Sequence, residues 1–290
     1  MPLLTQTQQD AFWTDGCVTV ENALTPEELS ACRAQFSAWV EESRAETSAY
    51  GAMIDGRPRF DMDPSHTNEH PALRRVSSPT EVSDAFLTVV RNSRVPQMCG
   101  ELFDRPIRFH HGKLNSKLPK TPTVVEWHQD FAFTPHSNDD QITALMFLDD
   151  VTDENGPLRV ARGSHKGPIH SHWRDDRFVG AVDAEVSAAA ERDVVYAKGP
   201  AGSVCLMHVR ALHASTANNS NAPRTLFICN FAAADAAALS PNPVPSEHMG
   251  MMVVGDDPNA VRATPFEMRM PEYPKGASFF VQQSDAESAG

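Results

Sequence analysis

The chain has 290 residues and a mass of 31.8 kDa, and 41% of its residues are hydrophobic, which suffices for a sizeable buried core and excludes disorder as the main state. Thirty-eight acidic residues against 25 basic ones give a formal net charge of -13, a balance that disfavours nucleic acids and anionic lipid surfaces as partners. No run is apolar enough for a membrane span, and the N-terminus lacks the basic flank and apolar stretch of a signal peptide, so we expect a cytoplasmic protein.

The first predicted element is a helix that begins near residue 26. Thr25 can cap it, Pro26 suits its first turn, and Glu28 stands three residues after the cap, as in a capping box. Apolar side chains then recur at helical spacing, at Leu29, Cys32, Phe36, Trp39 and Val40. The pattern predicts a helix that packs on the core, so its aromatic residues are assigned to packing rather than to a cofactor site.

The next segments predict a turn-rich stretch and a second helical region. Residues 61–70 read DMDPSHTNEH and are polar and rich in turn formers. Residues 80–102 are expected to be largely helical, with a break at Pro96, because proline removes a backbone donor and clashes with the preceding turn.

From residue 106 the pattern changes to short runs rich in β-branched and aromatic residues, separated by Gly, Pro, Asn and Asp. The runs are IRFHHGKLN, TVVEWHQDFAF, ITALMFLDDV, DVVYA, SVCLMHV and RTLFICNF. Because helices do not alternate with them, they predict a β-sandwich or barrel rather than a doubly wound sheet. The expected fold class is mainly β with flanking helices (α+β).

We expect one domain, because the chain shows no repeat at a fixed period and no low-complexity linker. A helical cover is expected over about residues 1–105 and a β core over about 106–235. The segment 236–290 begins rich in proline and methionine and is expected to pack on the core or to form a lid. The sequence does not distinguish a monomer from a homodimer.

The five cysteines are odd in number, widely spaced and without a C-x-x-C pair. This pattern predicts reduced, buried thiols rather than disulfides or a zinc knuckle. They are Cys17, Cys32, Cys99, Cys205 and Cys229.

A candidate metal site begins with His128 and Asp130 in a strand-like run, where residues two apart point to the same face. His213 follows another such run and precedes a third. Two histidines and one carboxylate on neighbouring strands are the facial triad that holds non-haem Fe(II) with three positions left open. The alternative is a hydrogen-bonded histidine at position 128 and a turn or cap residue at position 130.

A rival metal pair is His170 and His172, which have the same spacing as His128 and Asp130. They lie in a stretch full of Arg, Asp and Ser that is expected to be a loop. Loops position ligands less firmly than strands do, so we favour the first set.

Further motif residues surround the candidate ligands. HASTANNSNAPR (213–224) contains Ser215 two residues after His213 and Arg224 eleven residues after it. KLN, with Lys113 and Asn115, and ENGPLRVARGSHKG (154–167) precede it, and FWTDGCVTVENALTPEEL begins at residue 12. Together these motifs resemble the phytanoyl-CoA dioxygenase (PhyH) family of Fe(II)- and 2-oxoglutarate-dependent oxygenases, over about residues 12–231.

The resemblance implies a double-stranded β-helix, a cupin-like jelly-roll barrel with the metal at its open mouth. This fold agrees with the strand-rich pattern. One departure is Arg162, which stands where the family usually has proline before G-S-H. It puts the local turn in doubt but leaves the metal ligands unaffected.

By the resemblance, His128, Asp130 and His213 bind catalytic Fe(II), and 2-oxoglutarate and O2 are co-substrates. Arg224 is then expected to clamp the far carboxylate of 2-oxoglutarate in a fork of hydrogen bonds, with Ser215 as a second contact. Asn115 is expected near the keto acid end, and Lys113 is a weaker candidate that is otherwise a solvated strand residue.

The reaction implied is hydroxylation of an aliphatic C–H bond with release of succinate and CO2. Halogenating relatives lack the carboxylate ligand, so the presence of Asp130 favours hydroxylation. Two alternatives remain: a metal-dependent jelly-roll enzyme that does not use 2-oxoglutarate, and a jelly-roll binding protein without turnover. The presence of all three ligand types together with Arg224 disfavours the binding protein, and Arg224 with Ser215 disfavours the enzyme that does not use 2-oxoglutarate.

The primary substrate is expected to be a small polar metabolite, such as an amino-acid-like, amine or phosphonate compound. The acidic net charge disfavours a large polyphosphate conjugate such as an acyl-CoA, unless a local basic patch overrides it. Six residues are candidates for its pocket, with ordinary packing as the alternative for each: Trp127, Phe131, Phe133, Thr134, Arg159 and Trp173.

Overall fold

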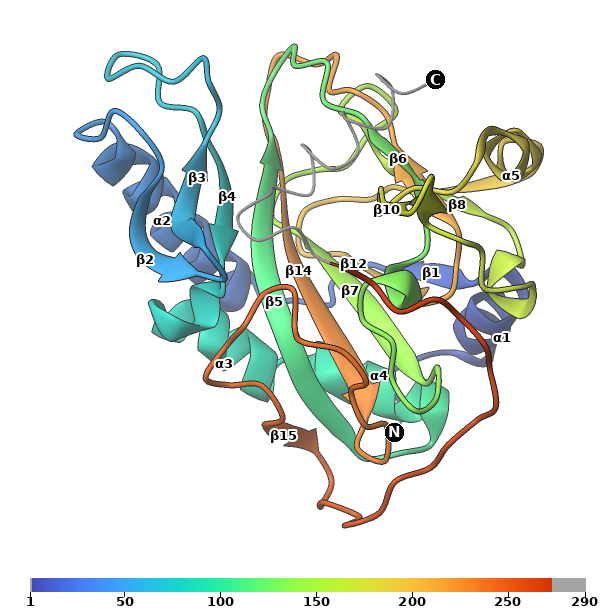
Figure 1. Cartoon of the computed structure of the whole chain (residues 1–290). Helices are drawn as coiled ribbons and strands as arrows, with labels where there is room; N and C mark the ends of the chain where they lie inside the picture. The colour runs from blue at the N-terminus through green and yellow to red at the C-terminus, as the bar shows by residue number, and fades with distance from the viewer. Residues whose placement is uncertain (1, 273–290) are drawn as a thin grey trace.

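Antiparallel strands make up most of the ordered elements (Figure 1). The structure, a computed structural model, describes residues 2–272. Within that range the helices are α1 (Gln6–Asp15), α2 (Pro26–Ser43), α3 (Asp84–Asn92), α4 (Arg94–Phe103) and α5 (Ala184–Ala190), with 3-10 turns η1 (Pro79–Glu81), η2 (Asp130–Ala132) and η3 (Ser164–Lys166). The strands are β1 (Cys17–Val20), β2 (Tyr50–Ile54), β3 (Arg57–Met62), β4 (Leu73–Ser77), β5 (Ile107–Lys117), β6 (Val125–His128), β7 (Gln141–Phe147), β8 (Leu158–Ala161), β9 (Trp173–Arg174), β10 (Arg177–Phe178), β11 (Val194–Ala197), β12 (Val204–His208), β13 (His213–Ser215), β14 (Arg224–Ala233) and β15 (Met252–Val254).

The strands form two main sheets. The larger sheet has the order β1-β12-β7-β14-β5-β4-β3-β2, with β15 added to β5, and the smaller one has the order β11-β8-β13-β6. Every pairing in them is antiparallel. The predicted class, mainly β with flanking helices, is confirmed, and each of the six predicted strand runs contains a strand.

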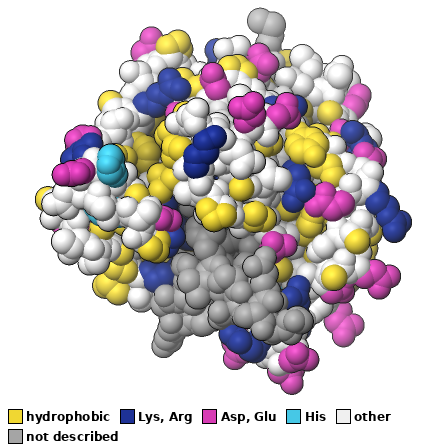
Figure 2. All heavy atoms as spheres, turned by 90° about the horizontal axis from the view of Figure 1, so that it is seen from above, with side chains coloured by type: hydrophobic (Ala, Val, Ile, Leu, Met, Phe, Trp, Pro, Cys, Tyr) yellow, Lys and Arg dark blue, Asp and Glu magenta, His cyan; other side chains and the backbone are white. Residues whose placement is uncertain are grey.

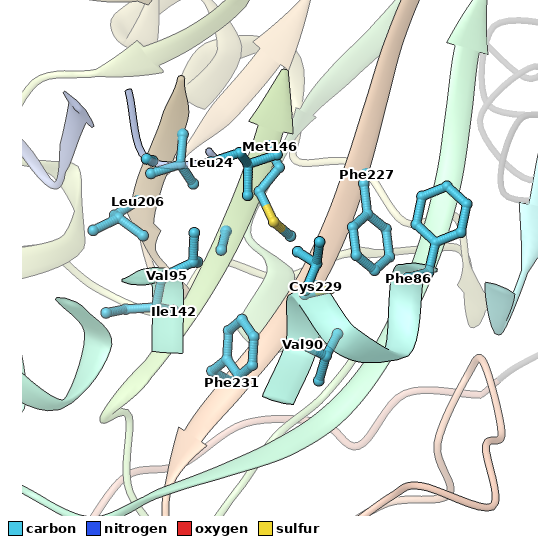
Figure 3. Packing of buried hydrophobic residues seen from close by; sticks show 14 of the residues in the cluster. Leu24, Phe86, Val90, Val95, Ile142, Met146, Leu206, Phe227, Cys229 and Phe231 are labelled. Carbon is cyan, nitrogen blue, oxygen red and sulfur yellow. The ribbon is translucent and has the colours of Figure 1, made fainter. Parts of the chain in front are cut away.

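The larger sheet has one face on the helices and one face on the smaller sheet. Along β14, Phe227, Cys229 and Phe231 enter the core that α2, α3 and α4 cover, as Figure 3 shows for the strand side chains. The alternate residues Leu226 and Ile228 point to the space between the sheets. The period of two in a strand thus gives one face to packing and the other to a site.

Strand β5 changes this alternation with a β-bulge. Asn230 of β14 pairs with His111, whereas the next residue, Phe231, pairs with Phe109, so His110 is the extra residue. Before the bulge, Phe109 lies in the helix-side core; after it, Leu114 does. The bulge therefore turns the odd-numbered residues from His111 onward away from the core, as a one-residue shift in a strand must.

The predicted helix near residue 26 is confirmed as α2, with a complete capping box between Thr25 and Glu28. The second helical region is also found, but the predicted break at Pro96 is wrong. The chain breaks at Ser93, which caps α4, and Pro96 lies in the first turn of that helix. A proline is tolerated there because the first-turn N–H groups have no partner within the helix.

The first 105 residues are not only a helical cover. They also contribute β1, which pairs with β12, and the strands β2 to β4, which extend the larger sheet beyond β5. The polar stretch 61–70 lies largely in the connection between β3 and β4. Strands β3 and β4 were missed because charged residues interrupt the apolar alternation, as the adjacent Arg74 and Arg75 do in β4.

The described part of the C-terminal segment packs against the body. Strand β15 pairs with β5, and Phe266 contacts Phe131 with ring centroids 5.1 Å apart. The Arg262 Nε lies 3.0 Å from Asp235 Oδ2 and its Nη2 also contacts Asp140. Residues 273–290, to which the lid prediction extends, lie outside the described residues.

All five cysteines are buried and free of disulfides, as predicted. Among residues 2–272, no helix combines the length and apolar character that crossing a membrane requires.

A large-to-small change in the helix-side core tests the packing (Figure 3). Phe86 of α3 is fully buried, stacks on Trp39 at 5.5 Å and meets Phe227 edge-on at 4.8 Å. We expect Phe86→Ala to lower the free energy of unfolding by about 3–5 kcal/mol, because it leaves a cavity where helices and sheet meet. Urea unfolding measures the change, and Val82→Ala, at an exposed position before α3, serves as a control with little effect.

Candidate active site

The three predicted metal ligands converge. Strands β6 and β13 are antiparallel neighbours, and His128 pairs directly with His213. The Nε2 atoms of His128 and His213 lie 3.7 Å and 3.6 Å from Asp130 Oδ1. One ligand atom from each of the three residues fits within 4.8 Å of the others, which is the spacing a single ion requires.

Hydrogen bonds orient these side chains. The Nδ1 atoms of His128 and His213 lie 2.7 Å from Glu126 O and 3.0 Å from Ala211 O. A carbonyl oxygen only accepts, so each Nδ1 carries the hydrogen and each Nε2 keeps a lone pair for a metal. Thr143 of β7 donates to Asp130 Oδ2 at 2.6 Å, which leaves Oδ1 on the side of the histidines.

The ionisation states suit metal binding. Burial and the neighbouring His128 lower the pKa of His213 to about 4, so its imidazole is neutral at physiological pH. Burial alone would raise the pKa of Asp130, but the facing His213 and His128 and the nearby Lys113 hold it below its usual range. Two imidazoles and one carboxylate are the donor set of a facial triad.

The expected strand placement of Asp130 is wrong in one respect. Strand β6 ends at His128, and Asp130 is the first residue of η2. Asp130 therefore reaches the histidines because the chain turns after β6, not because strand residues alternate.

The three residues line a cavity of about 230 Å³ between the two sheets. The four predicted co-substrate contacts, Arg224, Ser215, Asn115 and Lys113, line the same cavity. Strand β13 carries Ser215 two residues after His213, and β14 begins at Arg224. The Asn115 Oδ1 atom is buried without a hydrogen-bond partner, as expected of a group that faces a ligand.

Arg224 is buried in the cavity wall, and its Nη2 donates to Gly156 O at 2.8 Å. Burial lowers its pKa to about 10, so it stays charged at neutral pH. Gly156 has φ of 77°, and a Cβ there would lie 2.5 Å from Thr216 O, so only glycine fits this turn. The conformation of the Gly-rich segment thus helps to position the arginine.

Lys117, which the sequence analysis missed, is part of this end of the cavity. It pairs in register with Arg224, and its Nζ donates to Ser215 Oγ at 2.9 Å and to Thr123 O at 3.0 Å. Burial and the charge of Arg224 lower its pKa to about 6. The signal was present, because Lys117 follows Asn115 at strand spacing, but the predicted strand ended too early.

Of the six predicted substrate residues, Phe133 and Thr134 line the cavity. Trp127 does not, because it neighbours His128 on β6 and therefore points to the opposite face. Its Nε1 donates to Glu191 at 2.9 Å, and Arg159, also outside the cavity, lies over its ring at 5.3 Å.

The other two predicted residues are also placed elsewhere. Phe131 packs on Phe266, and Trp173 lines a separate small pocket, where Arg269 lies 3.5 Å above its ring. The rival pair also has other contacts: His172 Nε2 accepts from the Gln129 N–H at 2.9 Å, and its Nδ1 donates to His170 O at 2.9 Å. Both nitrogens of His172 are therefore occupied.

Comparison with known proteins decides the family. The model of the phytanoyl-CoA dioxygenase (PhyH) family matches residues 12–226. The chain belongs to the phytanoyl-CoA dioxygenase family. The family predicted from the sequence is confirmed, and with it the enzyme class, a dioxygenase.

Two relatives and one solved structure illustrate the range of this dioxygenase family. The chain is 32% identical over 236 residues to a probable alpha-ketoglutarate-dependent hypophosphite dioxygenase of Stutzerimonas stutzeri, covering 79% of each chain. It is 32% identical over 180 residues to an L-proline trans-4-hydroxylase of Streptomyces griseoviridis, covering 55% of this chain and 67% of the relative. The crystal structure of EctD from S. alaskensis with bound Fe shares the fold, with a TM-score of 0.67, 20% identity and coverage of 91% and 88%.

Proposed function

We propose that this dioxygenase uses Fe(II), 2-oxoglutarate and O2 to hydroxylate an aliphatic C–H bond of a small polar molecule, with release of succinate and CO2. The observation that carries the proposal is one cavity with a two-histidine, one-carboxylate cluster and a buried pair of basic residues, Lys117 and Arg224. A dianionic keto acid needs both features, a metal for its keto acid end and positive charge for its far carboxylate.

In this proposal His128, Asp130 and His213 hold the iron through the atoms that their hydrogen bonds leave open. The metal, when bound, supplies the centre at which 2-oxoglutarate and O2 react. The two sheets form the double-stranded β-helix of the family, within a single domain. This arrangement is supported by the packing of Leu226 and Val160 in one apolar cluster between the sheets.

The chain's own residues bind and orient the co-substrate. Arg224 offers a planar fork to the far carboxylate, and Ser215 can donate its hydroxyl to the same group while it accepts from Lys117. Asn115 is assigned to the keto acid end. Phe133 and Leu145 supply apolar walls that exclude water from the reacting carbon.

The relatives are named for hypophosphite and L-proline, both small and polar, which supports a small polar substrate here. A cavity of about 230 Å³ also suits small molecules rather than an acyl-CoA. The test is succinate formation from 2-oxoglutarate with Fe(II) across such compounds. With labelled dioxygen, one labelled atom is expected in succinate and one in the product. Absence of succinate with every compound would favour a metal enzyme without 2-oxoglutarate or a binding protein.

Lys117 makes the binding of 2-oxoglutarate sensitive to pH. In the ligand-free protein its pKa of about 6 leaves the amine mostly neutral near neutral pH. A carboxylate beside it favours the charged form, so we expect 2-oxoglutarate binding to take up about one proton at roughly pH 7.5 and to weaken as the pH rises. Calorimetry in buffers of different ionisation enthalpy measures the uptake. Lys117→Met is expected to abolish it, and equal uptake by both proteins would contradict this role.

A further inference from the structure

The cavity has the opposite charge balance to the chain as a whole. The chain carries a formal charge of -13, yet six basic residues line the cavity against three acidic ones. On the face that Figure 2 shows, basic and acidic side chains are interspersed. The basic residues are Arg57, Arg74, Arg75, Lys113, Lys117 and Arg224, and the acidic residues are Asp55, Asp63 and Asp130.

Three of these basic residues already have an assigned anion. Lys117 and Arg224 are assigned to the far carboxylate of 2-oxoglutarate. The Arg74 Nε lies 3.0 Å from Asp61 Oδ2, and its Nη1 lies 3.4 Å from Asp63 Oδ2. The other three lie on the consecutive strands β3, β4 and β5: Arg57 is near Asp55, and Lys113 is near Asp130, which leaves Arg75 to be considered.

Arg75 is the most unusual of them. It is 5% exposed, and its Nε is buried without a hydrogen-bond partner. Among residues 2–272, no carboxylate lies within ion-pair distance of it. Its strand partner Asp61 is the acceptor of Arg74 instead. A buried, unpaired guanidinium is costly, and such a group is retained where a ligand supplies the missing charge.

Arg75 also lies beside the proposed reaction centre. Its partner on β5 is Asn115, and Ser77, two residues further along β4, pairs with Lys113. Lys113 is close enough to Asp130 for each to shift the pKa of the other. Arg75 therefore lies one strand further from the metal ligands than Lys113, where a substrate next to the iron would place its far end.

We infer that the primary substrate carries an oxyanion, a phosphonate, phosphinate or carboxylate group, and that Arg75 binds it. This inference rests on the proposed function and narrows its substrate class. Compounds whose only charge is an amine are excluded, because they would face uncompensated positive charge at Arg75. Lys113 assists by adding positive charge on the metal side of the oxyanion.

The test measures equilibrium binding of small probe compounds by calorimetry, under nitrogen, to the protein saturated with Fe(II) and 2-oxoglutarate. The probes are hypophosphite and methylphosphonate for phosphorus oxyanions, acetate and L-proline for carboxylates, and ethanolamine as an amine without an oxyanion. We expect at least one oxyanion to bind and ethanolamine not to bind. Binding of ethanolamine, or binding of none of the four oxyanions, would overturn the inference. Which of the four bind shows whether the site prefers a phosphorus oxyanion or a carboxylate.

The variant test separates Arg75 from the co-substrate site. Arg75→Met is expected to weaken binding of the oxyanion by about tenfold or more, because one charged hydrogen-bonding partner is lost. The dissociation constant of 2-oxoglutarate is expected to stay unchanged. Arg75→Lys keeps the charge and is expected to lose less affinity for the oxyanion. A loss of 2-oxoglutarate affinity instead would assign Arg75 to the co-substrate and overturn the inference.

Arg74→Met combined with Asp61→Asn is the matched control, because it removes the neighbouring arginine together with the carboxylate that would otherwise be released beside Arg75. We expect it to change oxyanion binding by less than about threefold. An equal loss in both variants would show a general effect on β4 and contradict a specific role for Arg75. Failure of the proposed function is seen separately, as absence of succinate or of 2-oxoglutarate binding in the wild-type protein.

Discussion

Asp130→Ala is expected to abolish succinate formation. The carboxylate supplies both a fixed ligand atom and the negative charge beside His128 and His213. Without it, only the two imidazoles remain, and we expect iron affinity to fall by a large factor, about 100-fold or more. Iron content after dialysis and succinate release measure the two effects. An Asp130→Ala protein that retains iron and turnover would remove Asp130 from the site.

Two further variants make this result specific. Thr143→Val removes the hydroxyl that holds Asp130 Oδ2 and keeps the ligand itself. We expect an intermediate loss of activity, about tenfold to 100-fold, as is usual when a group behind a metal ligand is removed. Asp153→Ala, which removes an exposed carboxylate that pairs with Lys198, is the control and should behave as the wild-type protein does.

Arg224→Lys is expected to raise the apparent KM for 2-oxoglutarate by about one to two orders of magnitude, with iron binding little changed. Lysine keeps the positive charge but loses the planar fork of the guanidinium. Its single ammonium group cannot both reach the carboxylate and keep the hydrogen bond to Gly156 O. Steady-state kinetics at varied 2-oxoglutarate, with separate iron titration, measure the change. Unchanged dependence on 2-oxoglutarate would contradict the role of Arg224.

The matched control is Arg159→Lys. Arg159 lies on β8 but outside the cavity, where its Nη1 pairs with Glu191 at 2.7 Å. We expect this substitution to leave the 2-oxoglutarate constant and the turnover rate unchanged. A large effect would instead support the sequence-based assignment of Arg159 to the substrate pocket.

The sequence predicted those parts of the fold whose signal is local. The capping box of Thr25 and Glu28 identified α2, and apolar β-branched runs identified the strands of the larger sheet that lie behind the helices. The helix α1 was missed although Thr5 and Gln8 form the same kind of box, because its only fully buried residue is Phe12 and it shows no apolar stripe.

The candidate site was predicted in part, because some of its residues have motif spacing and others do not. His128, Asp130 and His213 were found from spacing and residue type. Arg75 was missed, because a buried arginine on β4 looks in sequence like a surface residue. Of the six residues predicted for the substrate pocket, Phe133 and Thr134 line the cavity, since which neighbours of a ligand face it depends on where β6 ends.

Because of the β-bulge at His110, the number of residues in β5 decides which of its side chains face the core and which face the cavity. Phe109 and Leu114 serve the core, and Lys113 and Asn115 serve the cavity, only because one extra residue separates the two halves. Removal of one residue there would exchange the two sets of side chains and put a lysine into the apolar layer, whereas substitutions would leave the phase intact. A change of one residue in the length of β5 would therefore disturb both the core and the cavity, whereas a substitution affects only the face on which its side chain lies.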